Sequence, residues 1–354
     1  MNLSVGIVGL PNVGKSTLFN TLTKNKADIA NYPFCTIDPN IGIVEVPDFR
    51  LEKLSTFSNS AKTIPAIVKF VDIAGLVKGA NKGEGLGNQF LSNIRETHSI
   101  IYVLRAFKNE KIINVLDQIN VIESKEILDT ELALKDLETI EKRLFSLKKD
   151  AKRGNKDAAK EVEVLENIET KLKEGVLIRD IDLPEVDKNI LKQYSLLTSK
   201  PCLFILNGKD NEVDQEIKDY FEKNNFKYII IDIRDEYDIA ALSDLEKEEL
   251  GMENKSEIDL LIRESYKLLD LITFFTTGKD ETRAWTIKNN TKAPEAAGVI
   301  HNDFKERFIK ADTINWKTLI ESISWENARS LGLIRSEGKE YTIKDGDVLE
   351  IKHN

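Results

Sequence analysis

A strand followed by a glycine-rich loop near the start of the chain constrains the fold more than any other feature. Residues 3–8 are mostly apolar and β-prone, and residues 9–17 read Gly-Leu-Pro-Asn-Val-Gly-Lys-Ser-Thr. This loop fits G-x-x-x-x-G-K-[ST], a pattern that wraps backbone N–H groups around the phosphates of a nucleoside triphosphate. A helix beginning near Lys15 would add its positive N-terminal end. The pattern predicts the first strand, loop and helix of an α/β nucleotide-binding fold.

Each residue type in this loop has a chemical reason. The two glycines let the chain turn tightly and approach a ligand closely. Lys15 is expected to reach the β- and γ-phosphates and to act in catalysis, and Ser16 is expected to offer its hydroxyl to Mg²⁺. The predicted nucleotide-binding residues of the loop are Asn12, Val13, Gly14, Lys15, Ser16 and Thr17. The alternative is a glycine-rich turn between a strand and a helix that binds nothing.

A second predicted strand ends in a carboxylate. Residues 66–71 are β-prone and run into Asp72-Ile73-Ala74-Gly75. A strand that ends in D-x-x-G is where a P-loop protein places a carboxylate on the Mg²⁺ side and a glycine N–H near the γ-phosphate. Asp72 is therefore a predicted metal residue, and Gly75 is a predicted catalytic residue. The D-x-x-G pattern is common, and its position after a P-loop is what gives it weight.

Two loop-forming segments flank this strand. Residues 31–40 contain two prolines and two asparagines, which predicts a loop. Thr36 in this loop is the candidate for a second hydroxyl ligand of Mg²⁺, and an ordinary turn threonine is the alternative. Residues 79–87 contain four glycines. A loop that orders on contact with the γ-phosphate and relaxes after hydrolysis would act as a switch, and a flexible linker is the alternative.

Composition limits the partners and the compartment. The 354 residues are 41% hydrophobic and carry a formal net charge of -9, which suits two or three domains but not a general coat for nucleic acid. Any RNA contact is therefore expected to be local. Cys35 and Cys202 form no C-x-x-C pair, so we expect neither structural zinc nor a disulfide framework. Apolar stretches are too short for a membrane span, and we expect a soluble, cytoplasmic protein.

Four motifs together resemble those of one family. They are G-L-P-N-V-G-K-S-T at 9–17, Y-P-F-C-T-I-D-P-N at 32–40, D-I-A-G-L-V-K-G-A at 72–80 and G-E-G-L-G-N-Q-F-L-S-N-I-R-E-T at 83–97. Here, and over nearly its whole length, the chain is similar to the YchF family of Obg-like ATPases, in the translation-factor class of P-loop NTPases. The resemblance implies binding and hydrolysis of ATP with Mg²⁺, association with the large ribosomal subunit, and a cytoplasmic monomer.

Two positions bear on what the resemblance implies for hydrolysis. Many small GTPases place a glutamine after D-x-x-G to orient the attacking water, and this chain has Leu76 there. The resemblance implies a hydrophobic residue at this position, slow intrinsic hydrolysis, and stimulation by a partner or a cation. Asn12 resembles the asparagine that helps to coordinate K⁺ in cation-activated relatives, so K⁺ is a further candidate cofactor.

The base-reading motif departs from both familiar patterns. A predicted strand at 201–206 leads into Asn207-Gly208-Lys209-Asp210. Guanine-specific relatives have N-K-x-D, whereas the YchF family typically has N-x-x-E and prefers ATP. Gly208 stands where the guanine-specific lysine would be, while Asp210 restores the guanine-type carboxylate. Asn207 and Asp210 are the predicted base-reading residues, and the resemblance favours ATP while GTP stays open.

A long charged segment between the two halves of this predicted site indicates a helical hairpin. Within 130–153, apolar residues recur at spacings of three and four, as in a coiled-coil seam. Gly154-Asn155 interrupts the pattern, a second amphipathic helix follows, and it ends near Gly175. The seam positions are Leu137, Ile140, Leu144, Leu147, Ala151, Val162, Leu165, Ile168 and Leu172. We expect an antiparallel pair, and such short pairs are usually structural.

Basic residues cluster beside the predicted turn of this hairpin. They are Lys148, Lys149, Lys152, Arg153 and Lys156. A dense basic patch on an acidic chain predicts local contact with RNA phosphates, as on a ribosome. A solvated helical tip is the alternative.

The last part of the chain changes from long helices to short strand-like runs. This part resembles the TGS domain that ends YchF-like proteins, a small β-grasp fold, and the resemblance makes it a second candidate ribosome contact. Asp345-Gly346 predicts a hairpin turn before the last strand. Trp285, Phe304 and Phe308 are candidates for stacking on RNA, and core packing is the alternative. The strand-like runs are 271–277, 283–287, 341–343 and 348–351.

The sequence thus predicts an α/β P-loop NTPase domain with an inserted antiparallel helical hairpin and a C-terminal β-grasp, TGS-like domain. The expected boundaries are 1–120 with 199–268 for the nucleotide-binding domain, 121–198 for the helical domain and 269–354 for the TGS-like domain. The expected function is a ribosome-associated ATPase switch. The alternatives are a GTPase of the same fold, a largely non-catalytic binding protein, which Leu76 favours, and a metabolic kinase, for which no acceptor site is evident.

Overall fold

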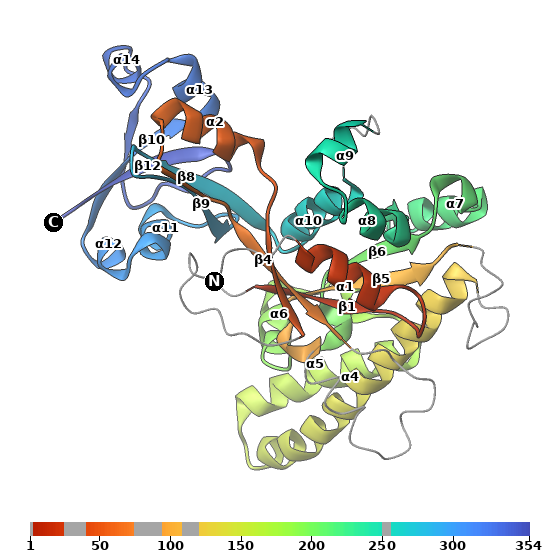
Figure 1. Ribbon diagram of the computed structural model, residues 1–354. Coiled ribbons are helices and arrows are strands. Elements are labelled where there is room, and N and C mark those ends of the chain that lie inside the picture. Colours follow the sequence, from red (N-terminus) through yellow and green to blue (C-terminus); the bar gives the residue numbers. More distant parts are fainter. Residues whose placement is uncertain (1–2, 25–39, 74–93, 108–119, 250–255) are drawn as a thin grey trace. The chain divides into compact units, whose positions relative to one another are not determined.

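The computed structural model describes residues 3–24, 40–73, 94–107, 120–249 and 256–354 (Figure 1). They divide into two compact units, each considered by itself. The P-loop unit comprises Ser4–Thr21 and Phe70–Lys247, and the C-terminal unit comprises Met1–Leu3, Leu22–Lys69 and Glu248–Asn354. The domain boundaries predicted above remain a prediction. Thr36, Gly75, Leu76, Cys35 and the glycine-rich segment 79–87 lie outside the described residues.

One six-stranded sheet carries the nucleotide-binding motifs, in the order β2-β4-β1-β5-β6-β7. Where the pairing of β1, β5, β6 and β7 is described it is parallel, with Ile7 opposite Ile101 and Asn207 opposite Ile231. Strands of a parallel sheet are covered on both faces, which explains why β1 is buried along its whole length. The strands are β1 Ser4–Val8, β2 Ile41–Glu45, β4 Ile67–Asp72, β5 Ser99–Arg105, β6 Cys202–Asn207 and β7 Tyr228–Ile231.

The predicted motifs follow the carboxyl ends of three of these strands. β1 leads into the P-loop, β4 ends at Asp72 and β6 ends at Asn207. In open α/β sheets, ligands bind beyond the carboxyl ends of the strands. The helices that follow the P-loop and the last two strands are α1 Lys15–Lys24, α7 Gln215–Lys223, α8 Ile233–Ile239 and α9 Asp244–Glu249.

The inserted segment forms the predicted helical hairpin. α4 is Val121–Lys152 and α5 is Lys156–Lys173, and the two lie antiparallel (Figure 1). Gly154 has a φ of 93°, and the side chain of Asn155 caps α5 by accepting from the Asp157 and Ala158 N–H groups. All predicted seam positions pack in one apolar cluster. No helix of the described residues is long and apolar enough to cross a bilayer.

Three short elements lead from the hairpin back to the sheet. They are η2 Ile178–Asp180, α6 Glu185–Lys192 and η3 Leu197–Ser199. Leu191 of α6 and Leu196, just before η3, are buried in the same cluster as the hairpin seam. The base of the hairpin is therefore packed against its own return path.

The C-terminal unit is built on a second six-stranded sheet, in the order β11-β10-β12-β8-β9-β3. Its pairs are antiparallel except for β12 with β8 and β3 with β9. Helix α11, Ala293–Ile300, packs its alanines against Phe274 and Ile287. A helix packed on a mixed sheet is the β-grasp arrangement that was predicted, and the TGS identity remains a prediction. The strands are β3 Lys62–Ile64, β8 Leu271–Thr277, β9 Glu281–Lys288, β10 Phe308–Asn315, β11 Arg335–Glu337 and β12 Asp347–His353.

Two elements from early in the sequence pack with the second sheet. They are β3 and helix α2, Phe49–Ser58. Arg50 on α2 forms ion pairs with Asp48 at 2.7 Å and with Asp345 at 2.6 Å. This packing was not predicted, because apolar spacing identifies a buried helix face but not its partner. The other helices of the C-terminal unit are α10 Glu257–Leu268, α12 Asn302–Glu306, α13 Trp316–Glu321 and α14 Trp325–Ser330.

The hairpin predicted at Asp345-Gly346 is wrong. Gly346 has the positive φ, 86°, that such a turn requires. However, the Asp345 carboxylate accepts from the Thr273 N–H of β8 at 2.9 Å, and the Gly346 N–H donates to the Thr273 carbonyl. The turn therefore directs β12 alongside β8. Of the predicted strand 341–343, Thr342 forms an isolated bridge with Lys292.

The aromatic residues considered for RNA stacking lie in or against the core of the second sheet. Phe308 is buried. Trp285 stacks on Phe274 with ring centroids 6.4 Å apart, and Phe304 stacks on His353 at 4.4 Å. Core packing, the alternative given above, explains these three positions.

Candidate functional site

The glycines of the P-loop are required by close contacts in the fold. A Cβ atom on Gly9 would lie 2.6 Å from the Val103 carbonyl oxygen of β5. A Cβ atom on Gly14 would lie 2.6 Å from the Asn207 side-chain nitrogen, and Gly14 has a φ of 101°. Only glycine fits both demands at Gly14. The loop is thus pressed against the ends of β5 and β6.

Lys15 begins α1 inside this loop. It is only 7% exposed, and its Nζ donates to the Leu10 carbonyl at 2.8 Å. Burial lowers the pKa of Lys15, and the nearby Asp72 carboxylate opposes that shift. The hydrogen bond to the Leu10 carbonyl therefore keeps the Lys15 ammonium group next to the loop. An incoming phosphate would offer it a charged acceptor instead.

Asp72 has an unsatisfied buried oxygen. Its Oδ1 has no hydrogen-bond partner in the described part of the chain. Burial raises the pKa of Asp72, and Lys15 counteracts the shift. A buried carboxylate oxygen without a donor is costly unless a cation or a water satisfies it.

Carboxylate and hydroxyl oxygens are the protein ligands that Mg²⁺ uses beside phosphates and water. Asp72 and the exposed Ser16 supply one of each, so the described residues fit a Mg²⁺ site. The other predicted hydroxyl, on Thr36, and the predicted γ-phosphate contact, at Gly75, fall outside the described residues.

Asn207 connects the end of β6 to two other loops. Its Nδ2 donates to the Val13 carbonyl at 2.8 Å, and its Oδ1 accepts from the Ile233 N–H at 3.1 Å. The side chain is 5% exposed. Both ends of the amide are therefore occupied, and Asn207 fixes the P-loop relative to the turn that follows β7.

The remaining base-motif residues contact neighbouring side chains and backbone. The Asp210 side chain is 80% exposed and pairs with Lys218 at 2.8 Å. A Cβ atom on Gly208 would lie 3.0 Å from the Phe107 backbone nitrogen. Lys209 points to Asp235, with an ion pair of 2.9 Å. The sequence did not predict that Phe107, which follows β5, lies beside Gly208. The Arg105 guanidinium carbon lies 4.6 Å from the centroid of the Phe107 ring.

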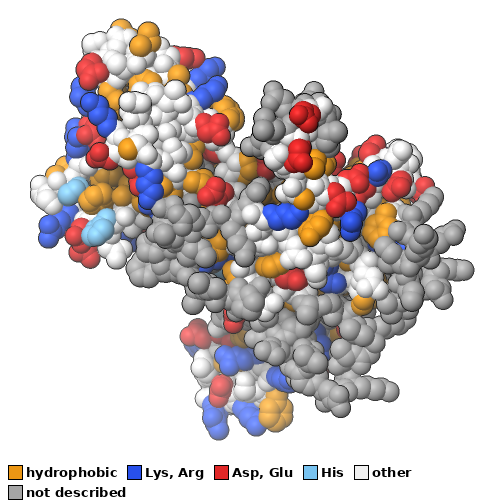
Figure 2. Space-filling model, in the orientation of Figure 1, with side chains coloured by type: hydrophobic (Ala, Val, Ile, Leu, Met, Phe, Trp, Pro, Cys, Tyr) orange, Lys and Arg blue, Asp and Glu red, His pale blue; other side chains and the backbone are white. Residues whose placement is uncertain are grey.

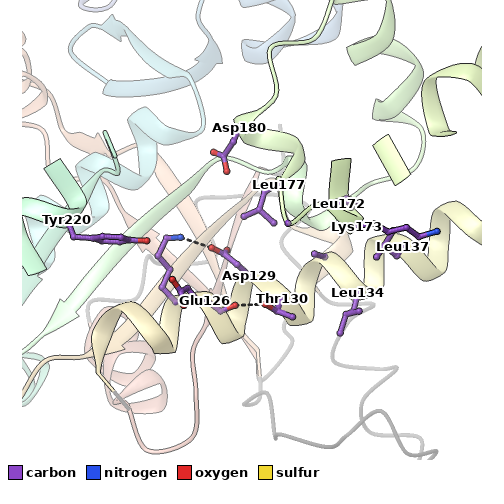
Figure 3. Close-up of a pocket in the computed structure, with 13 residues that line it drawn as sticks. Glu126, Asp129, Thr130, Leu134, Leu137, Leu172, Lys173, Leu177, Asp180 and Tyr220 are labelled. Atoms are coloured by element: carbon purple, nitrogen blue, oxygen red, sulfur yellow. Dashed lines mark hydrogen bonds and ion pairs between the residues drawn. The ribbon is translucent and has the colours of Figure 1, made fainter. Parts of the chain in front are cut away.

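A cavity of about 530 Å³ lies away from the P-loop, between the start of α4, the end of α5 and α7 (Figure 3). Lys125 and Asp129 pair at 2.8 Å beside it, and Asp129 also pairs with Arg179 at 2.6 Å. The Tyr102 hydroxyl donates to Asp129. This buried network was not predicted, because its members look like ordinary charges on a polar helix.

The basic tip is partly neutralised. Lys148 pairs with Glu166 of α5 at 2.7 Å, and Arg153 pairs with Asp150 at 3.5 Å. Lys149 lies 4.1 Å from the ring centroid of Phe145, an aromatic residue that is 69% exposed. Lys152 and Lys156 are exposed as well. Figure 2 shows basic side chains gathered with acidic ones on the hairpin.

Comparison with known proteins identifies the family. A family profile described as "50S ribosome-binding GTPase" matches residues 4–149, and the YchF-GTPase_C profile, a "Protein of unknown function (DUF933)", matches 271–354. The chain is 46% identical, over the full length of both proteins, to the "Ribosome-binding ATPase YchF" of Bacillus subtilis. This chain belongs to the YchF family. It is also 45% identical, again over both full lengths, to the protein of that name from Escherichia coli O157:H7.

A solved structure agrees with this family membership. The "Structure of the Schizosaccharomyces pombe YchF GTPase" superposes with a TM-score of 0.87 at 35% sequence identity. The match covers 99% of this chain and 98% of that one. The predicted family and the predicted fold class, a P-loop α/β domain with an inserted helical hairpin and a further C-terminal domain, are confirmed.

Proposed function

We propose that this YchF family member is a Mg²⁺-dependent ATPase that acts as a switch on the ribosome. The observation that carries the proposal is that three buried side-chain groups surround one P-loop: the Lys15 ammonium group, the Asp72 oxygen that has no partner among the described residues, and the Asn207 amide. Relatives that match over their full length carry the name ribosome-binding ATPase.

The P-loop residues would hold the phosphates. The backbone of Asn12, Val13, Gly14, Ser16 and Thr17 provides N–H groups, and Lys15 exchanges the Leu10 carbonyl for phosphate oxygens. Ser16 and Thr36 would ligate Mg²⁺ directly, with Asp72 in its outer sphere. Mg²⁺ bound there would neutralise charge that develops between the β- and γ-phosphates. Gly75 would contact the γ-phosphate.

A monovalent cation is the second cofactor we propose. Asn12 has a φ of 62°, and a positive φ is the conformation that asparagine tolerates best after glycine. In our proposal the Asn12 side chain lies on the phosphate side of the loop, where it would help to bind K⁺. Hydrolysis rates in equimolar K⁺ and Na⁺ test this: equal rates would remove K⁺ from the mechanism.

Family membership is what favours adenine over guanine in our proposal. The Asp210 carboxylate is paired with Lys218, and reading guanine with Asp210 would require breaking that ion pair. Because the Asp210 side chain is 80% exposed, such a pair contributes little, and the GTPase alternative stays open.

The ribosome contact is proposed to involve the basic tip and the TGS-like domain. Lys149, Lys152 and Lys156 are exposed beside the hairpin turn, and the exposed Phe145 ring would give bases a stacking surface. We assign the contact to the large subunit and propose a cytoplasmic monomer, as family membership implies.

Calorimetry with ATP and GTP, in the presence of Mg²⁺, tests the nucleotide assignment. ATP binding that is tighter by tenfold, about 1.4 kcal/mol, is the expected result. Equal or tighter GTP binding would make the protein a GTPase. A Lys15→Ala variant that lacks hydrolysis but keeps ribosome binding and biological activity would support the non-catalytic alternative instead.

A further inference from the structure

Lys200 is a buried lysine that the nucleotide site does not use. It is 8% exposed and lies between η3 and β6. Its Nζ donates to the Arg95 carbonyl at 3.0 Å and also to the Thr97 carbonyl. Residues 94–96 are helical, so these carbonyls belong to a helix C-terminus, where acceptors lack intrahelical partners. Lys200 therefore caps the helical turn at the carboxyl side of segment 74–93.

Asp136 on α4 holds the turn that carries Lys200. The carboxylate is 1% exposed and accepts three hydrogen bonds. They come from the Leu197 N–H at 2.8 Å, the Thr198 N–H at 2.8 Å and the Thr198 hydroxyl at 2.7 Å. Charge-assisted bonds of this kind are among the stronger ones. The η3 turn is therefore fixed to the base of the hairpin.

A second contact joins residue 95 directly to α4. The Arg95 guanidinium donates to the Thr139 hydroxyl. Thr139 is three residues after Asp136, and residues at that spacing share a helix face. One face of α4 thus contacts residues 95–97 twice, directly through Thr139 and indirectly through η3 and Lys200.

The same turn is anchored to the strand that precedes the P-loop. The His98 N–H donates to the Ser4 carbonyl at 2.8 Å, and the Ser4 N–H donates to His98 Nδ1 at 3.3 Å. A Cβ atom on Gly6 of β1 would lie 3.1 Å from the Thr97 hydroxyl oxygen. Packed and hydrogen-bonded contacts therefore run without a gap from β1 to α4.

We propose that Lys200, with Asp136 and Arg95, forms the positioning network through which the occupied nucleotide site sets the partner affinity of the helical hairpin. The proposal rests on the proposed ribosome-binding function. Lys200 and Asp136 are buried and hydrogen-bonded, and a close-packed interior of this kind transmits strain from one group to the next. The coupling is reciprocal, so the partner must change nucleotide affinity by the same factor.

The test compares ribosome affinity in two nucleotide states. Dissociation constants of full-length protein for purified ribosomes are measured with a non-hydrolysable ATP analogue and with ADP. For the wild type we expect the two to differ by about fivefold or more. In Lys200→Met and in Thr139→Val the ratio should fall towards one, while ATP affinity without ribosomes stays within about twofold of the wild type. Lys192→Met, at an exposed lysine of α6, is the matched control and should keep the full ratio.

Each outcome decides between the proposals. Wild-type ratios in both Lys200→Met and Thr139→Val overturn the network. Should Lys200→Met fail to fold, Thr139→Val decides, because it removes one hydroxyl from a partly buried position. A wild-type protein that binds ribosomes equally in both states overturns the coupling and leaves the ATPase proposal intact. A wild-type protein that binds no ribosomes overturns both the coupling and the proposed ribosome function.

Discussion

The Asn207 side chain donates to the Val13 carbonyl, and this bond joins residues 194 positions apart in the sequence. The same side chain accepts from the Ile233 N–H. Asn207 therefore holds the P-loop next to the turn that follows β7. Its proposed part in reading the base depends on these two hydrogen bonds.

Asn207→Ala should weaken both folding and nucleotide binding. It leaves the Val13 carbonyl and the Ile233 N–H without their partner, and we expect a loss of about 1–3 kcal/mol in the free energy of unfolding. Because Gly14 packs against the Asn207 amide, ATP affinity should fall as well, by about tenfold. Denaturant unfolding and calorimetry measure the two effects.

Asn207→Asp is a second variant for this prediction. It keeps an acceptor for the Ile233 N–H but cannot donate to Val13, and its buried carboxylate would repel both the Val13 carbonyl and bound phosphates. Its ATP affinity should therefore fall at least as far as that of the alanine variant. An alanine variant with wild-type stability and wild-type ATP affinity would show that the two Asn207 hydrogen bonds are unimportant.

Asp72→Asn should weaken the effect of Mg²⁺ on ATP affinity without lowering the free energy of unfolding of the metal-free protein. Burial raises the pKa of Asp72, so the ionised carboxylate is unfavourable in the fold and its neutralisation should not reduce stability without metal. The gain in ATP affinity on adding Mg²⁺ should shrink by about 10–100-fold, as for other outer-sphere ligands. Calorimetric titrations of ATP with Mg²⁺ and with EDTA measure this gain. An unchanged gain would remove Asp72 from the metal site.

Local sequence patterns predicted much of the fold, whereas contacts between distant parts of the chain were not predicted. The P-loop, the D-x-x-G strand and the hairpin seam are local patterns, since strand, turn and helix periodicities are contained within a few neighbouring residues. They were predicted within one or two residues at most boundaries. Arg50 pairing with Asp345, by contrast, joins positions 295 residues apart, and nothing in either neighbourhood encodes the other.

Buried charges were the second kind of feature that the sequence did not reveal. Asp136 and Lys200 occur in segments rich in charged residues, where a solvated side chain is the usual state. Their burial follows from where α4 and η3 meet, which depends on tertiary packing. The hairpin predicted at Asp345-Gly346 failed for a similar reason, because the carboxylate has a partner on β8 that no local rule anticipates.

Lys200 should give folding stability a pH dependence at alkaline pH. Desolvation lowers the pKa of Lys200 from 10.5 to about 8. The positive charge of Arg95 also lowers this pKa, whereas the negative charge of Asp136 raises it. Between pH 8 and 10.5 the unfolded chain then binds more protons at this position than the folded chain, so the free energy of unfolding rises with pH. Below about pH 8 both states are protonated and this contribution is flat.

Denaturant unfolding at pH 7, 8, 9 and 10 checks this prediction against Lys200→Met. Other lysines titrate equally in both proteins, so the difference between the two free energies isolates position 200. The difference should grow in favour of the wild type as the pH rises above 8. Parallel curves would mean that the two carbonyl acceptors keep the ammonium charged and that its pKa is close to the ordinary value.

Reversing exposed charges at the tip should weaken ribosome association selectively. The triple variant Lys149→Glu, Lys152→Glu and Lys156→Glu removes cations that are exposed beside the hairpin turn. If each cation neutralises one phosphate, the slope of log K against log salt should become shallower by about 0.7–0.9 per residue. ATP affinity should be unchanged, because the tip contributes no residue to the P-loop.

The control carries the same charge change elsewhere on the P-loop unit, at the exposed Lys188, Lys192 and Lys223. Ribosome co-sedimentation across a salt series distinguishes the two variants. Equal losses in both would mean that net charge alone governs association, because the chain is already acidic at -9 and any further negative charge repels RNA. A loss confined to the tip variant identifies the hairpin end as the contact, and co-sedimentation at the wild-type level would leave the tip as a solvated helix end.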